Sequence, residues 1–144
     1  AYFSCIQDIL QLQPSQPASQ VFVVGDSHVL PTAWQTVDLP VKGAEGVRRH
    51  ILVPSLVTGA KIFHLREESN FYTKAAFWER ISALPTGAPL VLLLGEIDCR
   101  EGILSSVQKG KYASIQDALG AVVELYLALL KQLPCCSSCY LLLV

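Results

Sequence analysis

The 144-residue chain lacks the positive charge and the long apolar runs that two large classes of protein require. Its 11 Lys+Arg and 12 Asp+Glu leave a formal net charge of -1, whereas nucleic acid and anionic membranes attract clustered Lys and Arg. The longest apolar runs, such as LVLLLG and YLLLV, are far shorter than the roughly 20 residues that span a bilayer. We therefore expect no nucleic-acid partner and no membrane span.

The cysteines are too few and too irregular for a metal site or a disulfide framework. The chain has five, at Cys5, Cys99, Cys135, Cys136 and Cys139, and an odd number at this spacing is unlike a secreted scaffold. The pair Cys136-x-x-Cys139 lacks the second pair that a zinc site requires. No signal peptide is visible. We expect no metal, no cofactor, free thiols, and a soluble protein in the cytoplasm or an organelle.

Several catalytic motifs are also missing. The segment GDSHVLP has neither the second Gly nor the Lys of a P-loop, no GxGxxG follows an apolar run, and G-x-S-x-G does not occur. What remains is a chain that is 51% hydrophobic and 16% charged, which is typical of one globular domain with a sizeable core.

The apolar pattern predicts alternating strands and helices. An amphipathic helix over 2–12 and a Pro-containing linker over 13–20 precede the main domain. We expect strands at 21–25, 60–65, 89–95 and 139–144, and helices at 71–84 and 114–133. Unbroken apolar strands alternating with helices predict an α/β fold, a doubly wound (flavodoxin-like) three-layer sandwich with a parallel sheet. We expect residues 1–20 to form the helix and linker, and residues 21–144 to form an α/β domain that is truncated after its fourth strand.

The helix over 114–133 carries the clearest terminal signal. Ser114 is placed as its N-cap, and Asp117 stands at the position where a capping box has Glu or Gln. The polar side chains of this helix share one narrow face, so we expect most of it to be buried.

Charged and polar side chains concentrate directly after the predicted strands. In a parallel sheet, ligands bind beyond the carboxyl ends of the strands, at the point where strand order reverses. The first strand is followed by Asp26, Ser27 and His28, the second by HLREES with His64 and Arg66, and the third by GEIDCREG with Glu96, Asp98 and Arg100. We expect a site where these segments meet.

The segment VVGDSH, followed about seventy residues later by LLLGEIDCR, resembles the SGNH (GDSL-like) hydrolase superfamily in a GDSH and GEIDCR form. The resemblance covers residues 21–133. It implies Ser27 as the nucleophile, with its backbone N–H as an oxyanion donor. It also implies that Gly59 belongs to the family's second block and that Gly95 and Asp98 belong to its third.

Two departures from the family pattern bear on activity. The oxyanion-donating Asn of the third block falls at Ile97, which has no donor, and losing one such donor costs about 10²–10³ in rate. The family's last block, D-x-x-H, does not occur in the chain. We therefore expect the isolated chain to show little or no esterase activity without a further His.

The candidate residues have alternative roles. Ser27 is either the nucleophile or a helix N-cap. His64 is either the base, with Asp98 as its catalytic partner, or a buried hydrogen-bonded His. Arg66 and Arg100 either grip an anion through their planar guanidinium groups, or Arg100 forms an ion pair with Asp98. Contact with substrate or oxyanion is assigned to Asp26, His28, Gly59, Arg66, Gly95, Glu96 and Arg100, and Trp34 and Tyr112 are candidates to line a pocket.

Two functions follow from these readings. The first is a serine esterase or acyl-transfer domain of SGNH type that acts on a small ester or an acylated carbohydrate. The second is a catalytically inactive SGNH-like domain that serves as a binding or assembly module with protein partners in a larger complex.

Overall fold

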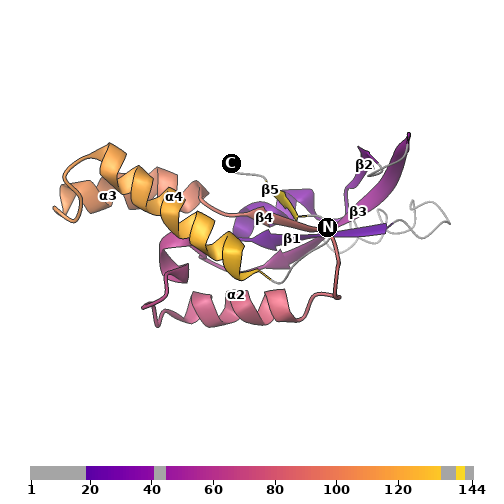
Figure 1. The fold of residues 1–144 in the computed structure, drawn as a ribbon, viewed down its shortest axis with the longest axis horizontal. Coiled ribbons are helices and arrows are strands. Elements are labelled where there is room, and N and C mark those ends of the chain that lie inside the picture. Colours follow the sequence, from indigo (N-terminus) through magenta and orange to yellow (C-terminus); the bar gives the residue numbers. More distant parts are fainter. Residues whose placement is uncertain (1–18, 41–44, 134–138, 142–144) are drawn as a thin grey trace, which may run out of the picture.

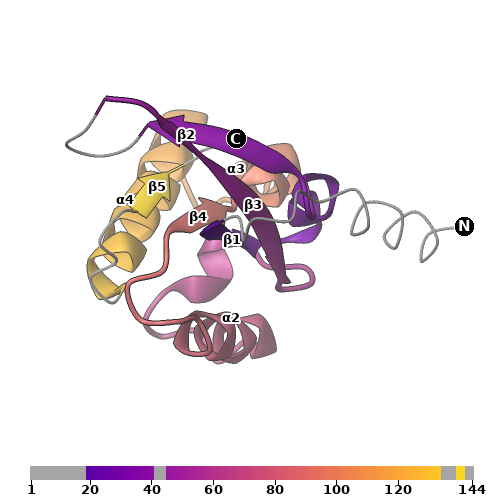
Figure 2. The same cartoon turned by 90° about the vertical axis from the view of Figure 1, so that its right-hand side faces the viewer.

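The structure is a computed structural model that describes residues 19–40, 45–133 and 139–141 (Figure 1). A curved sheet forms the centre, and the helices lie beside it and beyond one of its ends (Figures 1 and 2). The elements in chain order are β1 (Ser19–Gly25), η1 (Ser27–Thr32), β2 (Thr36–Pro40), β3 (Val47–Leu56), η2 (Ile62–Leu65), α2 (Tyr72–Ser82), β4 (Leu90–Leu93), η3 (Asp98–Gly102), α3 (Ile103–Gln108), α4 (Ile115–Gln132) and β5 (Cys139–Leu141).

The five-stranded sheet is mostly parallel, with the order β2-β3-β1-β4-β5. β1 pairs in parallel with β3 on one side and with β4 on the other, and β5 continues the parallel pairing beside β4. Only β2 is antiparallel, where it pairs with β3. The fold is therefore mixed α/β, and the predicted parallel pairing of 21–25 with 89–95 is confirmed. Residues 71–84 and 114–133 form the predicted helices as α2 and α4.

The strand predicted at 60–65 is wrong. Ile62–Leu65 form the short 3-10 helix η2, in which Ile62 and Leu65 are both buried on the same side. The missing parallel strand is β3, which the sequence analysis did not predict because Val47–Leu56 begins with exposed charged residues and contains Pro54. The predicted helix over 2–12 lies outside the described residues.

Both faces of the sheet carry apolar side chains into packed clusters. On one face, Leu90, Leu92 and Leu94 pack with Phe77 of α2 and with Tyr126 and Leu129 of α4. On the other face, Val23 and Leu93 pack with Val29 of η1. The contacts of Val29 therefore hold η1 against the second face of the sheet, directly after the end of β1.

The helix α4 begins as predicted but is less buried than predicted. Ser114 Oγ accepts from Asp117 N at 3.1 Å and donates to Asp117 Oδ2 at 2.8 Å, so the cap is confirmed. The sheet and its neighbours cover only one side of the helix, and the prediction of overall burial is wrong. Four large apolar residues spaced four apart are exposed, and we call them the α4 stripe: Ile115, Leu119, Val123 and Leu127.

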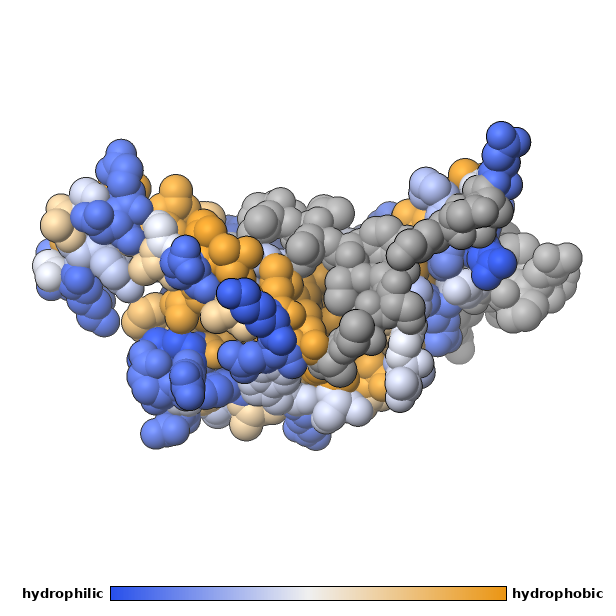
Figure 3. All heavy atoms as spheres, viewed as in Figure 1, coloured by the Kyte–Doolittle hydropathy of each residue, from blue (hydrophilic) through white to orange (hydrophobic). Residues whose placement is uncertain are grey.

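Figure 3 shows apolar side chains gathered over α4 on the face seen in Figure 1. None of the described helices has both the length and the apolar character needed to cross a membrane.

Candidate functional site

The segment after β1 forms a tight polar turn at the carboxyl end of the sheet. Asp26 is the N-cap of η1, so the alternative in which Ser27 caps the helix is wrong. Ser27 is the first residue of η1 and its side chain is exposed. Within the described residues, no hydrogen bond uses its hydroxyl or its backbone N–H. Ser27 therefore presents a free hydroxyl and a free N–H at the sheet edge.

Asp26 holds His28 in a fixed orientation. One carboxylate oxygen, Oδ1, accepts from the backbone N of His28 at 2.9 Å and lies 2.7 Å from Nδ1 of the same residue. Because an ionised carboxylate can only accept, Nδ1 of a neutral His28 carries the proton and Nε2 keeps its lone pair. Asp26 is 1% exposed, whereas the His28 side chain is 43% exposed. The imidazole is thus held by a buried carboxylate at Nδ1, while the rest of its ring is partly exposed to solvent. This is the arrangement of a general base oriented by a buried carboxylate.

The loop after β4 brings further charge to this turn. Glu96 Oε2 lies 3.8 Å from His28 Nε2, and Glu96 Oε1 lies 3.2 Å from a guanidinium nitrogen of Arg100. A small pocket of about 10 Å³ is lined by Asp26, His28, Glu96 and the end of β4. That volume is about the space of one water. Buried Asp26 Oδ2 has no hydrogen-bond partner, so a water there would meet an acceptor and an imidazole.

Asp98 has a structural task that occupies both of its oxygens. It is 2% exposed and begins the π-helical turn η3. Its Oδ2 accepts from Ile62 N at 2.8 Å and its Oδ1 accepts from Phe63 N at 3.3 Å, so it ties η3 to the start of η2. Burial raises the pKa of the Asp98 carboxyl, and the two backbone hydrogen bonds partly oppose that rise. Arg100 pairs with Glu96 and Glu101, not with Asp98.

We expect Asp98→Ala to lower the free energy of unfolding by about 1–3 kcal/mol, because the buried Ile62 N–H loses its acceptor. The raised pKa adds a pH dependence. The folded chain holds the Asp98 proton more tightly than the unfolded chain does. The stability that comes from this tighter proton binding is present below the ordinary pKa of 3.8 and is lost as the pH rises through the pKa of the folded chain. Urea unfolding between acidic and neutral pH measures both effects.

The control for this variant is Asp38→Ala, since Asp38 is an exposed partner of Arg49 on the edge of the sheet. It should change stability much less. An Asp98→Ala variant as stable as the parent chain would contradict the structural role.

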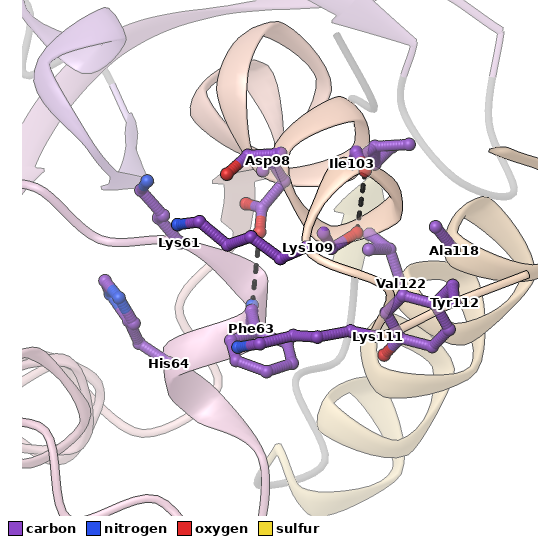
Figure 4. Close-up of a pocket in the computed structure, with 13 residues that line it drawn as sticks. Lys61, Phe63, His64, Asp98, Ile103, Lys109, Lys111, Tyr112, Ala118 and Val122 are labelled. Atoms are coloured by element: carbon purple, nitrogen blue, oxygen red, sulfur yellow. Dashed lines mark hydrogen bonds between the residues drawn. The ribbon is translucent and has the colours of Figure 1, made fainter.

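His64 lies at a second and larger cavity of about 330 Å³ (Figure 4). Its ring stacks on Phe71, with centroids 4.2 Å apart, and its buried Nδ1 has no partner among the described residues. Desolvation lowers the pKa of His64, and the charge of Lys61 lowers it further, so His64 is neutral at pH 7. Asp98 lines the same cavity, but no hydrogen bond joins it to His64 within the described chain.

The remaining predicted residues shape the loops. Gly59 and Gly95 have φ of 69° and 119°, in the region that favours glycine, and Gly95 turns the chain from β4 into the segment that carries Glu96 and Asp98. Arg66 donates to the carbonyl of Phe63 at 2.6 Å, pairs with Glu68 at 3.0 Å and stacks over the Phe63 ring. Its guanidinium group is thus engaged within its own loop.

The predicted residues therefore fall into two groups. Asp26, His28 and Glu96 meet beside β1 and β4, with Arg100 attached through Glu96, while His64 and Asp98 line the larger cavity. Neither lining includes Ser27. Tyr112 lines the larger cavity, as its irregular segment suggested. Lys61, Lys109 and Lys111 were not predicted as site residues, although the last two stand close together in KGK.

The prediction of free thiols without zinc rests on Cys135, Cys136 and Cys139, whose side chains lie outside the described part. Among residues 19–40, 45–133 and 139–141, no group of three His, Cys, Asp or Glu is placed to hold a metal ion. Cys99 is free and exposed.

No family model, curated protein or solved structure matches the chain. The assignment of a function therefore depends on the chain's own residues and their geometry.

Proposed function

We propose that the chain is an SGNH-like ester hydrolase or acyl-transfer domain with its site at Asp26, Ser27 and His28. The observation that carries the proposal is the 2.7 Å contact between His28 Nδ1 and the buried carboxylate of Asp26. The oriented imidazole of His28 supplies a general base, and the exposed hydroxyl of Ser27 supplies a nucleophile. These are the two groups that acyl transfer requires. The substrate class that the SGNH resemblance implies is a small ester or an acylated carbohydrate.

The order of the sheet supports this placement. The parallel strands, counted along the chain as β1, β3, β4 and β5, lie in the order second, first, third, fourth. A doubly wound sheet of the flavodoxin-like type has this order, and its ligands bind where the order reverses, between the first and third strands. In this chain those two strands are β1 and β4, and the loops after them carry Ser27 and Glu96.

In the proposed reaction, Ser27 Oγ attacks the acyl carbon and its proton passes to His28 Nε2, directly or through one water. The bond to the leaving alcohol then breaks, and the alcohol takes the proton from the imidazolium. Water repeats the sequence on the acyl-enzyme, or a sugar hydroxyl does so in transfer. The free N–H of Ser27 is the candidate oxyanion donor, and Glu96, 3.8 Å from Nε2, stabilises the imidazolium ion.

The test is the hydrolysis of p-nitrophenyl acetate by the parent chain and by Ser27→Ala. The sequence alone led us to expect little or no activity without a further His, but the His28 imidazole that Asp26 orients can act as that base, so we now expect turnover by the parent chain. The variant should show the rate of buffer alone, since the attacking oxygen is gone. Ser82→Ala is the matched control, because Ser82 is exposed on α2 and bonds only to the Glu79 carbonyl. Equal rates for the parent chain and Ser27→Ala would contradict the proposal.

A second candidate function is a binding or assembly module. The α4 stripe favours it, because four large apolar side chains that are 45–52% exposed on one helix face are typical of a protein contact. Ile97 also favours a binding or assembly module, because the SGNH family has an oxyanion-donating Asn at this position and Ile has no donor. An unreactive Ser27 would leave this candidate as the better one.

A further inference from the structure

The larger cavity combines a positively charged rim with an apolar wall. It lies between η2, the turn η3 with α3, and the start of α4 (Figure 4). Its volume of about 330 Å³ falls within the range of small-molecule sites, about 300–1,000 Å³. These four elements thus enclose a space large enough for a ligand with a ring.

Three lysines line this one cavity, in a chain whose formal net charge is -1. Figure 4 shows Lys61, Lys109 and Lys111 extending toward the same opening, on the side of His64. Lys61 lies 3.9 Å from Glu101. Within the described residues, neither Lys109 nor Lys111 has a carboxylate within 4.0 Å, and Lys111 Nζ stands 5.6 Å from the Phe63 ring centroid. Two ammonium groups at the opening are therefore without a counter-ion among the residues that the structure describes.

The only acid among the lining residues is Asp98, and its carboxylate oxygens point at backbone donors. Both accept N–H groups of η2, as described above, and no ion pair joins Asp98 to Lys109 or Lys111 among the described residues, so one carboxylate faces three lysines in this lining. His64 adds no charge at pH 7, because desolvation and the charge of Lys61 lower its pKa. The cavity thus has an excess of positive charge.

The opposite wall is apolar and aromatic. Phe63 and Tyr112 contribute rings, and Ile103, Ala118 and Val122 contribute aliphatic surface. These residues come from η2, α3, α4 and the segment between α3 and α4. In Figure 4, Phe63 lies beside Lys111, and Ile103, Ala118, Val122 and Tyr112 lie toward the right. A ligand that fills the cavity therefore needs an anionic group at one end and an apolar body at the other.

We propose that this cavity binds a phosphate monoester with an aromatic body. A phosphate monoester carries close to two negative charges at pH 7, which match the two lysines that lack a counter-ion, and lysine binds phosphate as a point charge. The ring of the ligand packs against Phe63 and Tyr112. This site is separate from Ser27 and does not depend on the proposed acyl transfer, because binding is measured without turnover.

The test measures the binding of phenyl phosphate by calorimetry, with phenol and inorganic phosphate as reference probes. We expect saturable binding of phenyl phosphate that is tighter than that of either reference. The double variant Lys109→Ala, Lys111→Ala should bind about tenfold or more weakly, since it loses two hydrogen bonds to a charged group. Lys131→Ala is the matched control, because Lys131 is an exposed lysine of α4 outside the lining, and it should bind like the parent chain.

Salt gives a second readout on the unmodified chain. Binding should weaken steeply toward about 1 M salt, where the screening length falls to about 3 Å. The proposal is overturned by the absence of saturable binding, by binding that salt does not change, or by a double variant that binds as the parent chain does. Phenol or inorganic phosphate binding as tightly as phenyl phosphate would overturn it as well.

Discussion

Replacing His28 by Ala should lower kcat/KM for p-nitrophenyl acetate by about 10²–10⁴, the usual contribution of a positioned general base. Asp26→Asn should cause a loss in the same range, because an amide can donate to Nδ1 and so favour the tautomer whose Nε2 carries the proton. Both variants keep Ser27, so the loss reports the base and its orientation. Steady-state kinetics at neutral pH measure it.

The other histidines make this experiment selective. His50→Gln is the control, since His50 lies on β3 opposite Ser19, at the end of β1 remote from Gly25, and the rate should stay unchanged. His64→Gln tests the alternative from the sequence in which His64 is the base. If His64→Gln removes the activity and His28→Ala does not, the base is His64 and the role given to the Asp26–His28 pair is wrong.

Gly25→Ala should lower the free energy of unfolding by about 3 kcal/mol or more, which is at the upper end for added core volume. β1 and β4 approach so closely here that a Cβ would collide with the carbonyl oxygen of Leu93. It would also stand 2.8 Å from the Leu93 carbonyl carbon and 3.1 Å from Val29 Cγ1. Backbone cannot give way as a flexible side chain can, so the strands would separate just below the turn that carries Asp26 and Ser27. Thermal unfolding should show a fall in Tm of about 6 °C or more.

Gly120→Ala is the matched substitution in an open place. Nothing lies within 4 Å of a Cβ at Gly120 on the exposed side of α4, so this variant should gain about 0.8–1.0 kcal/mol from helix propensity. Two glycine-to-alanine changes of opposite sign would support the close β1–β4 contact. A Gly25→Ala chain as stable as the parent would show that the two strands are farther apart at this point.

The regular parts of the fold were predictable from the sequence because their patterns are local. The apolar run 89–95 and the capped helix 114–133 carry their own length and end signals, and they form β4 and α4. β3 was missed because its exposed first half continues past the core to pair with β2, so residues such as Arg48 and Arg49 interrupt the apolar pattern. The segment 60–65 was mistaken for a strand because it is a short, mostly apolar run. A 3-10 helix with buried residues three apart can produce the same run.

The site was predictable in place but not in pairing. Parallel topology collects the strand ends, so Asp26, Ser27, His28 and Glu96 were expected at one edge of the sheet. The pairing of Asp26 with His28 depends on the cap geometry: a carboxylate that accepts from the N–H two residues on lies beside that residue's ring. The sequence signal for this pairing is an Asp directly before a short helix, with a His two residues later. From the sequence alone, His28 was expected to contact substrate or oxyanion and not to act as the base.

We propose above that Ser27 is a nucleophile and that His28 is its general base. The most direct test is labelling with a fluorophosphonate probe, followed by peptide mass spectrometry. The account predicts stoichiometric modification of Ser27 in the 144-residue chain, strongly slowed in His28→Ala and unchanged in His50→Gln. Absence of labelling at Ser27 in the folded parent chain, or labelling at the same rate in His28→Ala, would contradict it.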